Sequence, residues 1–533
     1  MLIKLHTFTL LGIDAIPIEV EVDLSPGEFN ISLVGLPAPV VRESVQRVNR
    51  AIENSGFPVP GNRILINLAP AELHKQAASF DLPFAVGFLA GMGKLPVDKI
   101  SEYAIVGELA LDGSLRPVRG ALSMAIACAK SGKKNRRPLG LILPAENAPE
   151  AAVVEDIEVI PVHSLAQTLG FLRGDVDIDP APSCIDEIYA KLSNYDSDFS
   201  DVRGQEMAKR ALTIAAAGAH NILMIGPPGS GKTMLAKRLP SVLPPFMTHE
   251  SVETTRIYSS QGMINRDNPL LVTRPFRSPH HTISDAGMVG GGTTPAPGEI
   301  SLAHNGVLFL DELPEFARRT LEVLRQPLED RQITISRALA TSTFPSDFML
   351  VAAMNPCPCG YRGDIRRPCS CTVPMIDRYM SKISGPLLDR IDIHIEVPAV
   401  PFEELAGISQ GTSSEDIRRQ VIAARDIQAK RFGRDSREEE PPEKISSYAR
   451  SPRTTHYNAQ MSSRKIRQHC QLDQTGLRLL RDAMNDFGLS ARAHDKVLRI
   501  ARTIADLDAS PRIQVQHITE AINYRILDRS LWV

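Results

Sequence analysis

The sequence predicts an α/β protein with a central parallel sheet, and two observations carry this prediction. The first is the run GPPGSGKT at 226–233, which follows an apolar stretch at 221–225 and precedes good helix formers at 234–238. Strand, glycine-rich turn and helix in this order form the context that a P-loop requires. The second is that the apolar runs 306–310 and 348–354 are each followed by polar residues. Buried strands with polar side chains at their carboxyl ends are typical of parallel sheets that bind ligands there.

The P-loop residues have the chemistry that binds phosphate. Glycines allow successive backbone N–H groups to point at the α- and β-phosphates of a nucleotide, and the following helix adds its positive end. Lys232 is expected to reach the β- and γ-phosphates of ATP, and Thr233 to offer its hydroxyl to Mg²⁺. The alternative is a glycine turn before a helix that carries Lys-Thr by chance. The predicted nucleotide-binding residues are Gly226, Pro227, Pro228, Gly229, Ser230, Gly231, Lys232 and Thr233.

An acidic pair follows the second apolar run. Asp311 and Glu312 come directly after the strand predicted at 306–310, so they belong to the edge of the sheet where ligands bind. Asp311 is expected to hold Mg²⁺ through water, and Glu312 to polarise the water that attacks the γ-phosphate. An apolar strand that ends in Asp-Glu is moderately specific by itself. After a P-loop it strongly favours a nucleotide hydrolase.

Length and composition indicate a multidomain protein without a membrane segment. The 533 residues suggest three or four domains at about 150 residues each. The formal net charge is −2 and 43% of the residues are apolar, so nothing global indicates a nucleic-acid or membrane partner. No uninterrupted apolar run approaches the roughly 18 residues that span a bilayer, and the first residues lack the apolar block of a signal peptide. We therefore expect a cytoplasmic protein.

Composition and periodicity divide the chain into four segments. We expect an α/β domain at 1–176, a proline-containing linker at 177–198, the P-loop domain at 199–400 and a helical domain at 401–533. The first domain is expected to contain short alternating strands within 2–36, a helix at 40–55, a strand at 64–68 and helices at 82–92 and 122–131. The last is expected to contain helices at 403–406, 414–432, 462–470, 475–484, 491–506 and 516–524, and a charged loop at 434–443. Residues 451–533 carry 13 Lys and Arg against 8 Asp and Glu, which favours a nearby polyanion or a solvated helical surface.

Four of the seven cysteines are crowded into fifteen positions. Cys357, Cys359, Cys369 and Cys371 offer the four soft ligands that suit a tetrahedral Zn²⁺. The Cys-x-Cys spacing differs from the usual Cys-x-x-Cys, so an iron–sulfur centre and four free thiols are the alternatives. Because the cluster begins two residues after Asn355, we expect it to stiffen the loop beside the nucleotide. The separate cysteines are interpreted as packing residues: Cys128, Cys184 and Cys470.

Two motifs in the first domain carry a family resemblance. They are SFDLPFAVG at 79–87 and VGELALDGSLRPV at 106–118, and they resemble the protease-type domain of Lon and its inactive relative in RadA. Ser79 falls near the catalytic serine of Lon, whereas the position of the catalytic lysine falls at 122–123, and no lysine occurs between Lys99 and Lys130. A serine without a base is not an activated nucleophile. The domain is therefore expected to be a structural or DNA-guiding ring and not a protease.

Four motifs of the P-loop domain occur in the order found in magnesium-chelatase-like AAA+ ATPases. They are GPPGSGKT, LFLDE at 308–312, Met354-Asn355 and LLDRID at 387–392. This resemblance implies that Asn355 is a sensor that orients the attacking water, and that Arg390 is an arginine finger for a neighbouring subunit. A finger that acts in trans requires a ring, and a closed hexamer is the expected assembly. The alternative for Arg390 is a surface ion pair with Asp389 or Asp392.

The same resemblance gives interpretations for further segments. The run LSARAHDKVLR at 489–499 resembles the second sensor helix, in which Arg492 contacts the γ-phosphate and couples hydrolysis to lid movement, whereas Arg499 is structural or subunit-contacting. Val202 and Gln205 are candidates for the adenine pocket or for ordinary packing. Inserts at 273–284, 287–293, 333–340 and 343–348 are expected to project into a central channel, the last two as a hairpin. The candidate phosphate contacts there, which otherwise belong to a solvated loop and a hairpin, are Arg277, His280, His281 and Arg337.

Over nearly the full chain, the motifs resemble those of the ComM/YifB family. The resemblance implies a Lon-protease-like α+β domain, an AAA+ P-loop ATPase domain and a C-terminal helical lid. It further implies a hexamer that hydrolyses ATP to drive branch migration of recombination junctions, with a role in natural transformation and with single-stranded or branched DNA as partner. One alternative is a motor subunit of magnesium chelatase, although such subunits lack a Lon-like domain and the chain has no Asp-x-Ser-x-Ser motif. Another is an ATP-dependent protease or protein remodeller.

Overall fold

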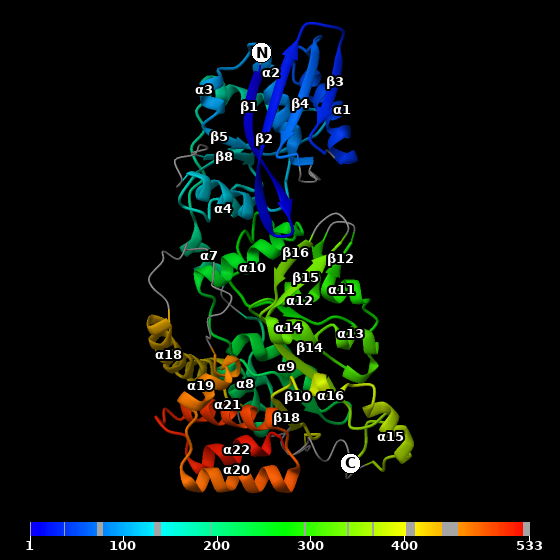
Figure 1. The fold of residues 1–533 in the computed structure, drawn as a ribbon, viewed down its shortest axis with the longest axis vertical. Helices are drawn as coiled ribbons and strands as arrows, with labels where there is room; N and C mark the ends of the chain where they lie inside the picture. The colour runs from blue at the N-terminus through cyan, green and yellow to red at the C-terminus, as the bar shows by residue number, and fades with distance from the viewer. Residues whose placement is uncertain are drawn as a thin grey trace.

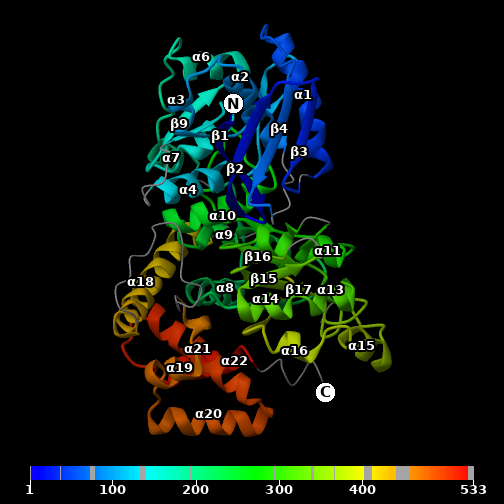
Figure 2. The ribbon, with the colours of Figure 1, turned by 45° about the horizontal axis from the view of Figure 1, so that its top comes forward.

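The computed structural model describes residues 2–36, 38–71, 78–132, 140–192, 195–292, 295–337, 341–364, 367–400, 411–439 and 457–525. The described chain forms three parts that follow one another along the long axis of the molecule (Figure 1). A mixed sheet with its helices lies at one end, a parallel sheet lies in the middle, and the helices α19 to α22 lie at the other end. The same order is visible when the molecule is turned (Figure 2).

The N-terminal part is organised around a seven-stranded sheet of order β3-β4-β2-β1-β5-β8-β9. The strands are β1 (Leu2–Leu11), β2 (Asp14–Ser25), β3 (Asn30–Val34), β4 (Arg63–Ala69), β5 (Tyr103–Ile105), β8 (Gly140–Pro144) and β9 (Glu158–Val162). β2 pairs antiparallel with β1 and β4, whereas the other neighbours are parallel. The strands predicted as short within 2–36 include one long hairpin, β1–β2, because no breaker interrupts their alternating pattern before Gly12, where φ is +64°.

Helices cover this sheet, and three of the six that the structure describes were predicted. They are α1 (Pro39–Asn54), α2 (Asp81–Gly91), α3 (Val97–Ile100), α4 (Ala121–Gly132), α5 (Ala148–Ala151) and α6 (Leu165–Arg173), beside the small hairpin β6 (Glu108–Leu109) and β7 (Leu115–Arg116). The predictions of helices at 40–55, 82–92 and 122–131 and of a strand at 64–68 are confirmed. α2 is buried along its length because it is apolar on all sides. It approaches the sheet so closely that a Cβ at Gly87 would lie 2.7 Å from Val22.

The segment predicted as a linker contains a helix that the sequence analysis missed. α7 spans Ile185–Leu192. Ile188 is buried in the hydrophobic cluster that includes Ala121 and Leu141 of the N-terminal part. One apolar face therefore attaches this segment to the first domain.

The middle part contains a five-stranded sheet of order β11-β14-β17-β10-β18, in which every pair is parallel. The strands are β10 (Ile222–Ile225), β11 (Phe276–Arg277), β14 (Val307–Leu310), β17 (Met349–Met354) and β18 (Ile393–Glu396). The three apolar runs predicted as strands of this sheet, at 221–225, 306–310 and 348–354, are confirmed as β10, β14 and β17. The prediction of a projecting insert at 273–284 is wrong for Phe276 and Arg277. These two residues form the edge strand β11, which is too short to show a periodic pattern in the sequence.

Short helices and two hairpins complete the middle part. The helices are α8 (Glu206–Gly218), α9 (Lys232–Val242), α10 (Thr248–Ser260), α11 (Asp285–Val289), α12 (Glu299–Leu302), α13 (Arg318–Glu322), α14 (Arg325–Asp330), α15 (Val373–Met380) and α16 (Gly385–Leu388). The hairpins are β12 (Gly290–Gly291) with β13 (Ala296–Pro297), and β15 (Gln332–Ser336) with β16 (Thr341–Pro345). The hairpin predicted between 333 and 348 is therefore confirmed.

The C-terminal part is helical. Its helices are α18 (Ser414–Glu439), α19 (Ser463–His469), α20 (Gln474–Phe487), α21 (Ala491–Leu507) and α22 (Val515–Asn523). The four helices predicted after 460 are confirmed, whereas the helix predicted at 403–406 lies outside the described residues. The charged loop predicted at 434–443 is wrong for 434–439, where α18 continues, because Arg and Glu are good helix formers whatever their charge. Apolar side chains of α8, α18 and α21 share one core.

The N-terminal part is joined to α10 of the middle part. The Arg256 guanidinium donates to the Ile13 carbonyl at 3.2 Å, to Ser123 Oγ at 3.2 Å and to Asp14 Oδ1 at 2.5 Å. Ser259 donates to the buried carboxyl of Glu150, whose pKa is raised by burial. Ile13 itself packs in the hydrophobic cluster of the middle part. The two parts are therefore fastened by polar and apolar contacts together. Within the described ranges, every helix is too short or too polar to cross a bilayer.

We predict that Arg256→Ala loosens this joint. The change removes three polar contacts at a half-buried position, which should cost about 1–2 kcal/mol and lower the midpoint of thermal unfolding by about 1–2 °C. Arg50→Ala is the matched control, because Arg50 pairs with Glu53 on the exposed surface of α1 and should change stability by less than about 0.5 kcal/mol. Equal effects of the two substitutions would contradict the assignment of Arg256 to the joint.

Candidate nucleotide-binding site

The P-loop follows β10, the strand at the centre of the parallel sheet. Gly229 and Gly231 have φ values of +77° and +88°, which side chains disfavour, and α9 begins directly after Gly231. Gly226 allows the loop to pass the neighbouring strand, because a Cβ there would lie 2.1 Å from the carbonyl oxygen of Val397. The glycines therefore produce a tight turn that leads into a helix N-terminus, as the sequence predicts.

Lys232 lies inside this loop. Its ammonium donates to the carbonyl oxygens of Gly226 at 2.7 Å and Pro227 at 2.9 Å, and it lies 3.4 Å from Asn355 Oδ1 at the end of β17. Burial lowers the pKa of Lys232, and the charge of Asp311 opposes this effect. The loop thus holds a single cation among backbone groups at the carboxyl ends of β10 and β17.

Thr233 and Asp311 are in direct contact. The Thr233 hydroxyl donates to Asp311 Oδ2 at 2.7 Å. Oxygen donors of this kind are the ligands that Mg²⁺ prefers, so the pair fits the magnesium ion that the family uses. Glu312 follows with φ +52° and ψ 47°, a conformation that directs the chain away from the strand. Its carboxylate lies 3.4 Å from His281 Nδ1. The structure therefore brings Lys232, Thr233 and Asp311 together with Glu312 beside them.

The two weaker adenine-pocket candidates differ in their surroundings. Gln205 donates to the carbonyl oxygens of Ser230 at 3.3 Å and Pro398 at 2.6 Å, so it connects the P-loop with the end of β18. Val202 is buried in the hydrophobic core that also contains Leu235 of α9. Gln205 lies at the nucleotide loop, and Val202 supports the helix behind it.

Arg390 and Arg492 lie at the opposite end of the sheet. β10 and β18 are parallel, with Ile222 beside Ile393 and Ile225 beside Glu396. The P-loop follows Ile225, whereas Arg390 precedes Ile393, so a strand length of about 10 Å separates the two ends. Arg390 and Arg492 line one cavity of about 380 Å³. The arrangement separates both arginines from the P-loop of their own chain.

Both arginines contact carboxylates in that cavity. Arg390 pairs with Glu329 and donates to the carbonyl oxygen of Pro386 at 2.6 Å. Arg492 lies 3.7 Å from Asp389. The sequence analysis offered an ion pair of Arg390 with Asp389 or Asp392 as an alternative. The structure shows an ion pair of Arg390 with Glu329 on α14 instead.

The candidate phosphate contacts of the inserts divide into two groups. Arg277 is bound by Glu299 through two hydrogen bonds of 2.6 Å, so its guanidinium is engaged within the sheet edge. His280 and His281 have ring centres 4.1 Å apart, and Arg337 is exposed where β15 ends. The histidines and Arg337 are therefore the accessible members of the predicted set.

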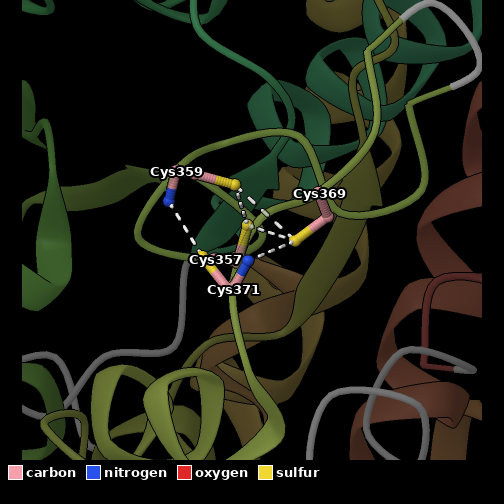
Figure 3. Close-up of side chains that lie close together, drawn as sticks. All are labelled: Cys357, Cys359, Cys369 and Cys371. Atoms are coloured by element: carbon pink, nitrogen blue, oxygen red, sulfur yellow. Dashed lines mark hydrogen bonds between the residues drawn. The ribbon is translucent and has the colours of Figure 1, made fainter.

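The four crowded cysteines form one cluster (Figure 3). Their sulfur atoms all lie within 4.8 Å of one another, and three of the sulfur pairs are 3.3, 3.6 and 3.7 Å apart. A tetrahedral Zn²⁺ with bonds of about 2.3 Å to sulfur sets such pairs about 3.8 Å apart, so the cluster has the dimensions of a four-thiolate metal site. The N–H groups of Tyr361 and Ser370 lower the pKa of Cys359, whereas burial and the neighbouring thiols raise the pKa of Cys369 and Cys371.

The cluster touches the P-loop. Gly360, in the turn after Cys359, has φ +85°, and a Cβ there would lie 2.6 Å from Cδ of Pro228. Cys357 is only two residues beyond Asn355. The cluster therefore lies next to both a phosphate-loop residue and the candidate sensor.

The separate cysteines are of two kinds. Cys128 and Cys470 are buried, and burial raises the pKa of each thiol to about 12, in agreement with their interpretation as packing residues. Cys184 is exposed, so its interpretation as a packing residue is wrong. It follows the prolines of the linker, where the sequence has no apolar periodicity that would separate buried from exposed side chains.

Comparison with known proteins gives the same division of the chain. Three family models match the chain. Residues 198–405 match "Magnesium chelatase, subunit ChlI", and residues 20–147 match "Subunit ChlI of Mg-chelatase". Residues 411–525 match "Magnesium chelatase, subunit ChlI C-terminal". The chain is 42% identical to the competence protein ComM of Haemophilus influenzae, over 98% of this chain and 97% of ComM. This chain belongs to the ComM/YifB family of magnesium-chelatase-like proteins. The uncharacterized protein YifB of Escherichia coli is 43% identical over 99% of this chain and 97% of YifB.

A more distant relative matches about a third of the chain. Lon protease 2 of Bacillus subtilis is 29% identical over 203 residues, which correspond to 32% of this chain and 35% of that protease. The parallel sheet and its helices are those of an AAA+ P-loop domain, as the family predicts.

Sequence reasoning missed the buried groups around Arg390. Asp392 and Lys496 lie 3.3 Å apart, and His220 Nδ1 lies 3.4 Å from the same aspartate. Asp392 lies just before β18, His220 follows α8 and Lys496 lies on α21, so the three are far apart in the sequence. No spacing rule relates them, and only the fold reveals their contact.

We predict that Gly360→Ala weakens ATP binding. The new Cβ would collide with Pro228 and displace the P-loop, which should lower the affinity for ATP by about 10-fold, or about 1.4 kcal/mol. Gly363→Ala is the matched control, because its φ is +81° but a Cβ there meets no atom within 4 Å. Both substitutions share the conformational cost of about 1 kcal/mol, and only the first touches the loop. Titration with a fluorescent ATP analogue measures the difference, and equal affinities of the two variants would contradict the coupling.

Proposed function

We propose that this protein is an ATP hydrolase that works as a ring-shaped motor on DNA. The observation that carries the proposal is the division of charged groups between the two ends of one parallel sheet. Lys232, Thr233, Asp311 and Asn355 gather at one end, and Arg390 and Arg492 lie at the other. A subunit has both halves of a hydrolytic site but holds them apart, so adjacent copies must combine them.

The groups at the carboxyl ends of the strands bind the nucleotide. Lys232 and the loop N–H groups would hold the phosphates, and Thr233 with Asp311 would hold Mg²⁺, which would supply positive charge to stabilise the phosphates. Glu312 orients the attacking water, and Asn355 aligns it with the γ-phosphate.

The arginines complete the site of the neighbouring subunit. A guanidinium that reaches the γ-phosphate stabilises the charge that develops in the transition state. Arg390 and Arg492 share one cavity, so both act on the same neighbour. A head-to-tail interface of this kind closes into a ring, and we propose a hexamer in which the C-terminal helices carry Arg492 as a lid.

DNA is the proposed partner for three reasons. The family resemblance implies branch migration of recombination junctions, and the relative from Haemophilus influenzae is named a competence protein. Residues 451–533 are basic, with 13 Lys and Arg against 8 Asp and Glu. Arg337, His280 and His281 are accessible on the insert segments and suit phosphate contacts.

The alternatives have weaker support. Ser79 is buried, and its Oγ makes no hydrogen bond with any residue that the structure describes. At 122–123, where the resemblance to Lon expects the catalytic lysine, Ser123 donates to the Ile13 carbonyl and contacts Arg256. A chelatase role rests on the family models and on 26% identity to the magnesium-chelatase 67 kDa subunit of Chlorobaculum parvum, over 160 residues and 30% of this chain.

The ATPase rate with different nucleic acids tests the proposal. It is measured without nucleic acid and with single strands, duplex or a four-way junction, each at two salt concentrations, with Lys232→Ala as the inactive control. We expect stimulation that is largest with the junction and weakens as salt rises, because phosphate contacts release counterions. An unchanged rate in all nucleic acids would overturn the DNA assignment, and casein degradation or porphyrin metallation would then identify the alternative.

We also propose that the cysteine cluster binds one structural Zn²⁺ through Cys357, Cys359, Cys369 and Cys371. Four thiolates satisfy a closed tetrahedral site, so the ion would connect the ends of the loop and hold it against Pro228.

Elemental analysis of the purified protein should find about one zinc per chain. Cys369→Ser should lose the metal and lower the midpoint of thermal unfolding, because metal binding contributes to folding. Cys184→Ser, at an exposed cysteine outside the cluster, is the control that should keep the metal. Iron in place of zinc, or a metal-free protein of unchanged stability, would show the assignment to be wrong.

A further inference from the structure

Arg390 and Arg492 are each close in sequence to a buried charge. Arg390 is two residues before Asp392, in the turn between α16 and β18. Arg492 is one helical turn before Lys496 on α21, so the two side chains lie on the same side of that helix. Asp392 and Lys496 are 6% and 7% exposed, respectively, and their charged groups lie 3.3 Å apart. One buried ion pair therefore joins the two segments that carry the arginines.

The ion pair is held by further hydrogen bonds on both sides. Lys496 Nζ donates to the carbonyl oxygen of Ile391 at 2.9 Å, between Arg390 and Asp392. The second carboxylate oxygen of Asp392 accepts from the backbone N–H of Asn221 at 3.3 Å and lies 3.4 Å from His220 Nδ1. Burial would raise the pKa of Asp392, but Lys496 and His220 outweigh it and the pKa is lowered. The aspartate is therefore an ionised group with fixed partners.

The position of Arg390 is also fixed through its backbone. The Asn221 side chain donates from Nδ2 to the carbonyl oxygen of Arg390 at 3.0 Å, and its Oδ1 accepts from the backbone N–H of Leu350. Arg525 donates to the carbonyl oxygen of Ile391 at 2.6 Å. The turn that carries Arg390 is thus tied to the starts of β10 and β17, whereas Lys496 is its ionic connection to α21.

We propose that Asp392 and Lys496 are positioning residues that set the distance between Arg390 and Arg492, so that both guanidinium groups reach one nucleotide of the neighbouring subunit. A buried ion pair is weak evidence for stability, because the cost of removing two charges from water offsets their attraction. Its better attested use is to specify one arrangement among several of similar energy. An arginine that stabilises a transition state needs such an arrangement, since a displacement of about 1 Å can cost 100-fold in rate.

The proposal rests on the proposed ATP hydrolysis with arginines acting in trans, and two substitutions test it. Lys496→Met removes the ammonium but keeps the length of the side chain, and Asp392→Asn changes a single atom. We expect kcat to fall by about 10- to 100-fold in each, towards the value of Arg390→Ala. KM for ATP should change much less, because the P-loop lies at the other end of the sheet.

Arg502→Met is the matched control. Arg502 is another buried cation of α21, and it pairs with Asp506 nearly three turns beyond Arg492. Its loss should destabilise the same helix but leave the spacing of the arginines unchanged, so kcat should stay near the wild-type value. A common loss of kcat in Arg502→Met and Lys496→Met would show that any damage to α21 suffices, and would overturn the positioning role.

Mixed rings separate positioning from misfolding. Lys232→Ala subunits have intact arginines but a defective P-loop, and Lys496→Met subunits have the reverse. In a random equal mixture about one interface in four joins a working P-loop to working arginines, so the mixture should hydrolyse ATP at up to about a quarter of the wild-type rate. Absence of recovery would assign the defect to the variant's own fold and overturn the proposal. Should Lys496→Met fail to fold, Asp392→Asn carries the same test.

The outcomes distinguish this proposal from the one it rests on. If Arg390→Ala hydrolyses ATP slowly and both Lys496→Met and Asp392→Asn keep the wild-type kcat, the positioning role of Asp392 and Lys496 is wrong. The action of Arg390 on the neighbouring subunit then stands. If Arg390→Ala itself keeps the wild-type rate, or the wild-type protein does not hydrolyse ATP, the proposed function is wrong. The positioning role of Asp392 and Lys496 is then wrong as well.

Discussion

The parallel pairing of β10 between β17 and β18 is the constraint on which the rest of the structure depends. Parallel strands place all their carboxyl ends at one edge of the sheet. The P-loop after β10 and Asn355 after β17 are therefore neighbours in space. The same pairing places the start of β18, with Arg390 before it, at the other edge. One register therefore determines which charged groups gather and which are kept apart.

Elements outside the sheet hold this arrangement. The cysteine cluster lies against Pro228 just after Asn355, and its turn depends on the positive φ of Gly360. At the opposite edge, Lys496 and Arg525 bind the carbonyl oxygen of Ile391 beside Arg390. Both edges are thus supported by segments that come later in the sequence than the strands they stabilise. The C-terminal helices therefore affect the site by holding the backbone beside Arg390 in place.

The sequence predicted the strands of the sheet and the P-loop because these depend on local patterns. Apolar runs of four to six residues and glycine spacing are visible without any knowledge of the fold. β11 was missed because two residues have no period, and α18 was predicted too short because charge was taken as a sign of a loop. The end of the sheet to which Arg492 belongs could not be predicted, since it follows from packing of α21 against residues far away in the chain. The partner of Arg390 was misassigned for the same reason.

The contact of Ser123 with Arg256 has a consequence for proteolysis by the N-terminal part. Ser123 is 2% exposed, donates to the Ile13 carbonyl at 2.6 Å and lies 3.2 Å from the Arg256 guanidinium. A lysine at this position, one of the two at which the Lon resemblance expects the catalytic base, would place an ammonium against that guanidinium in a buried site. Ser123 thus belongs to the contact between the N-terminal part and α10. A base introduced at this position would have to displace Arg256, and it would therefore weaken that contact at the same time.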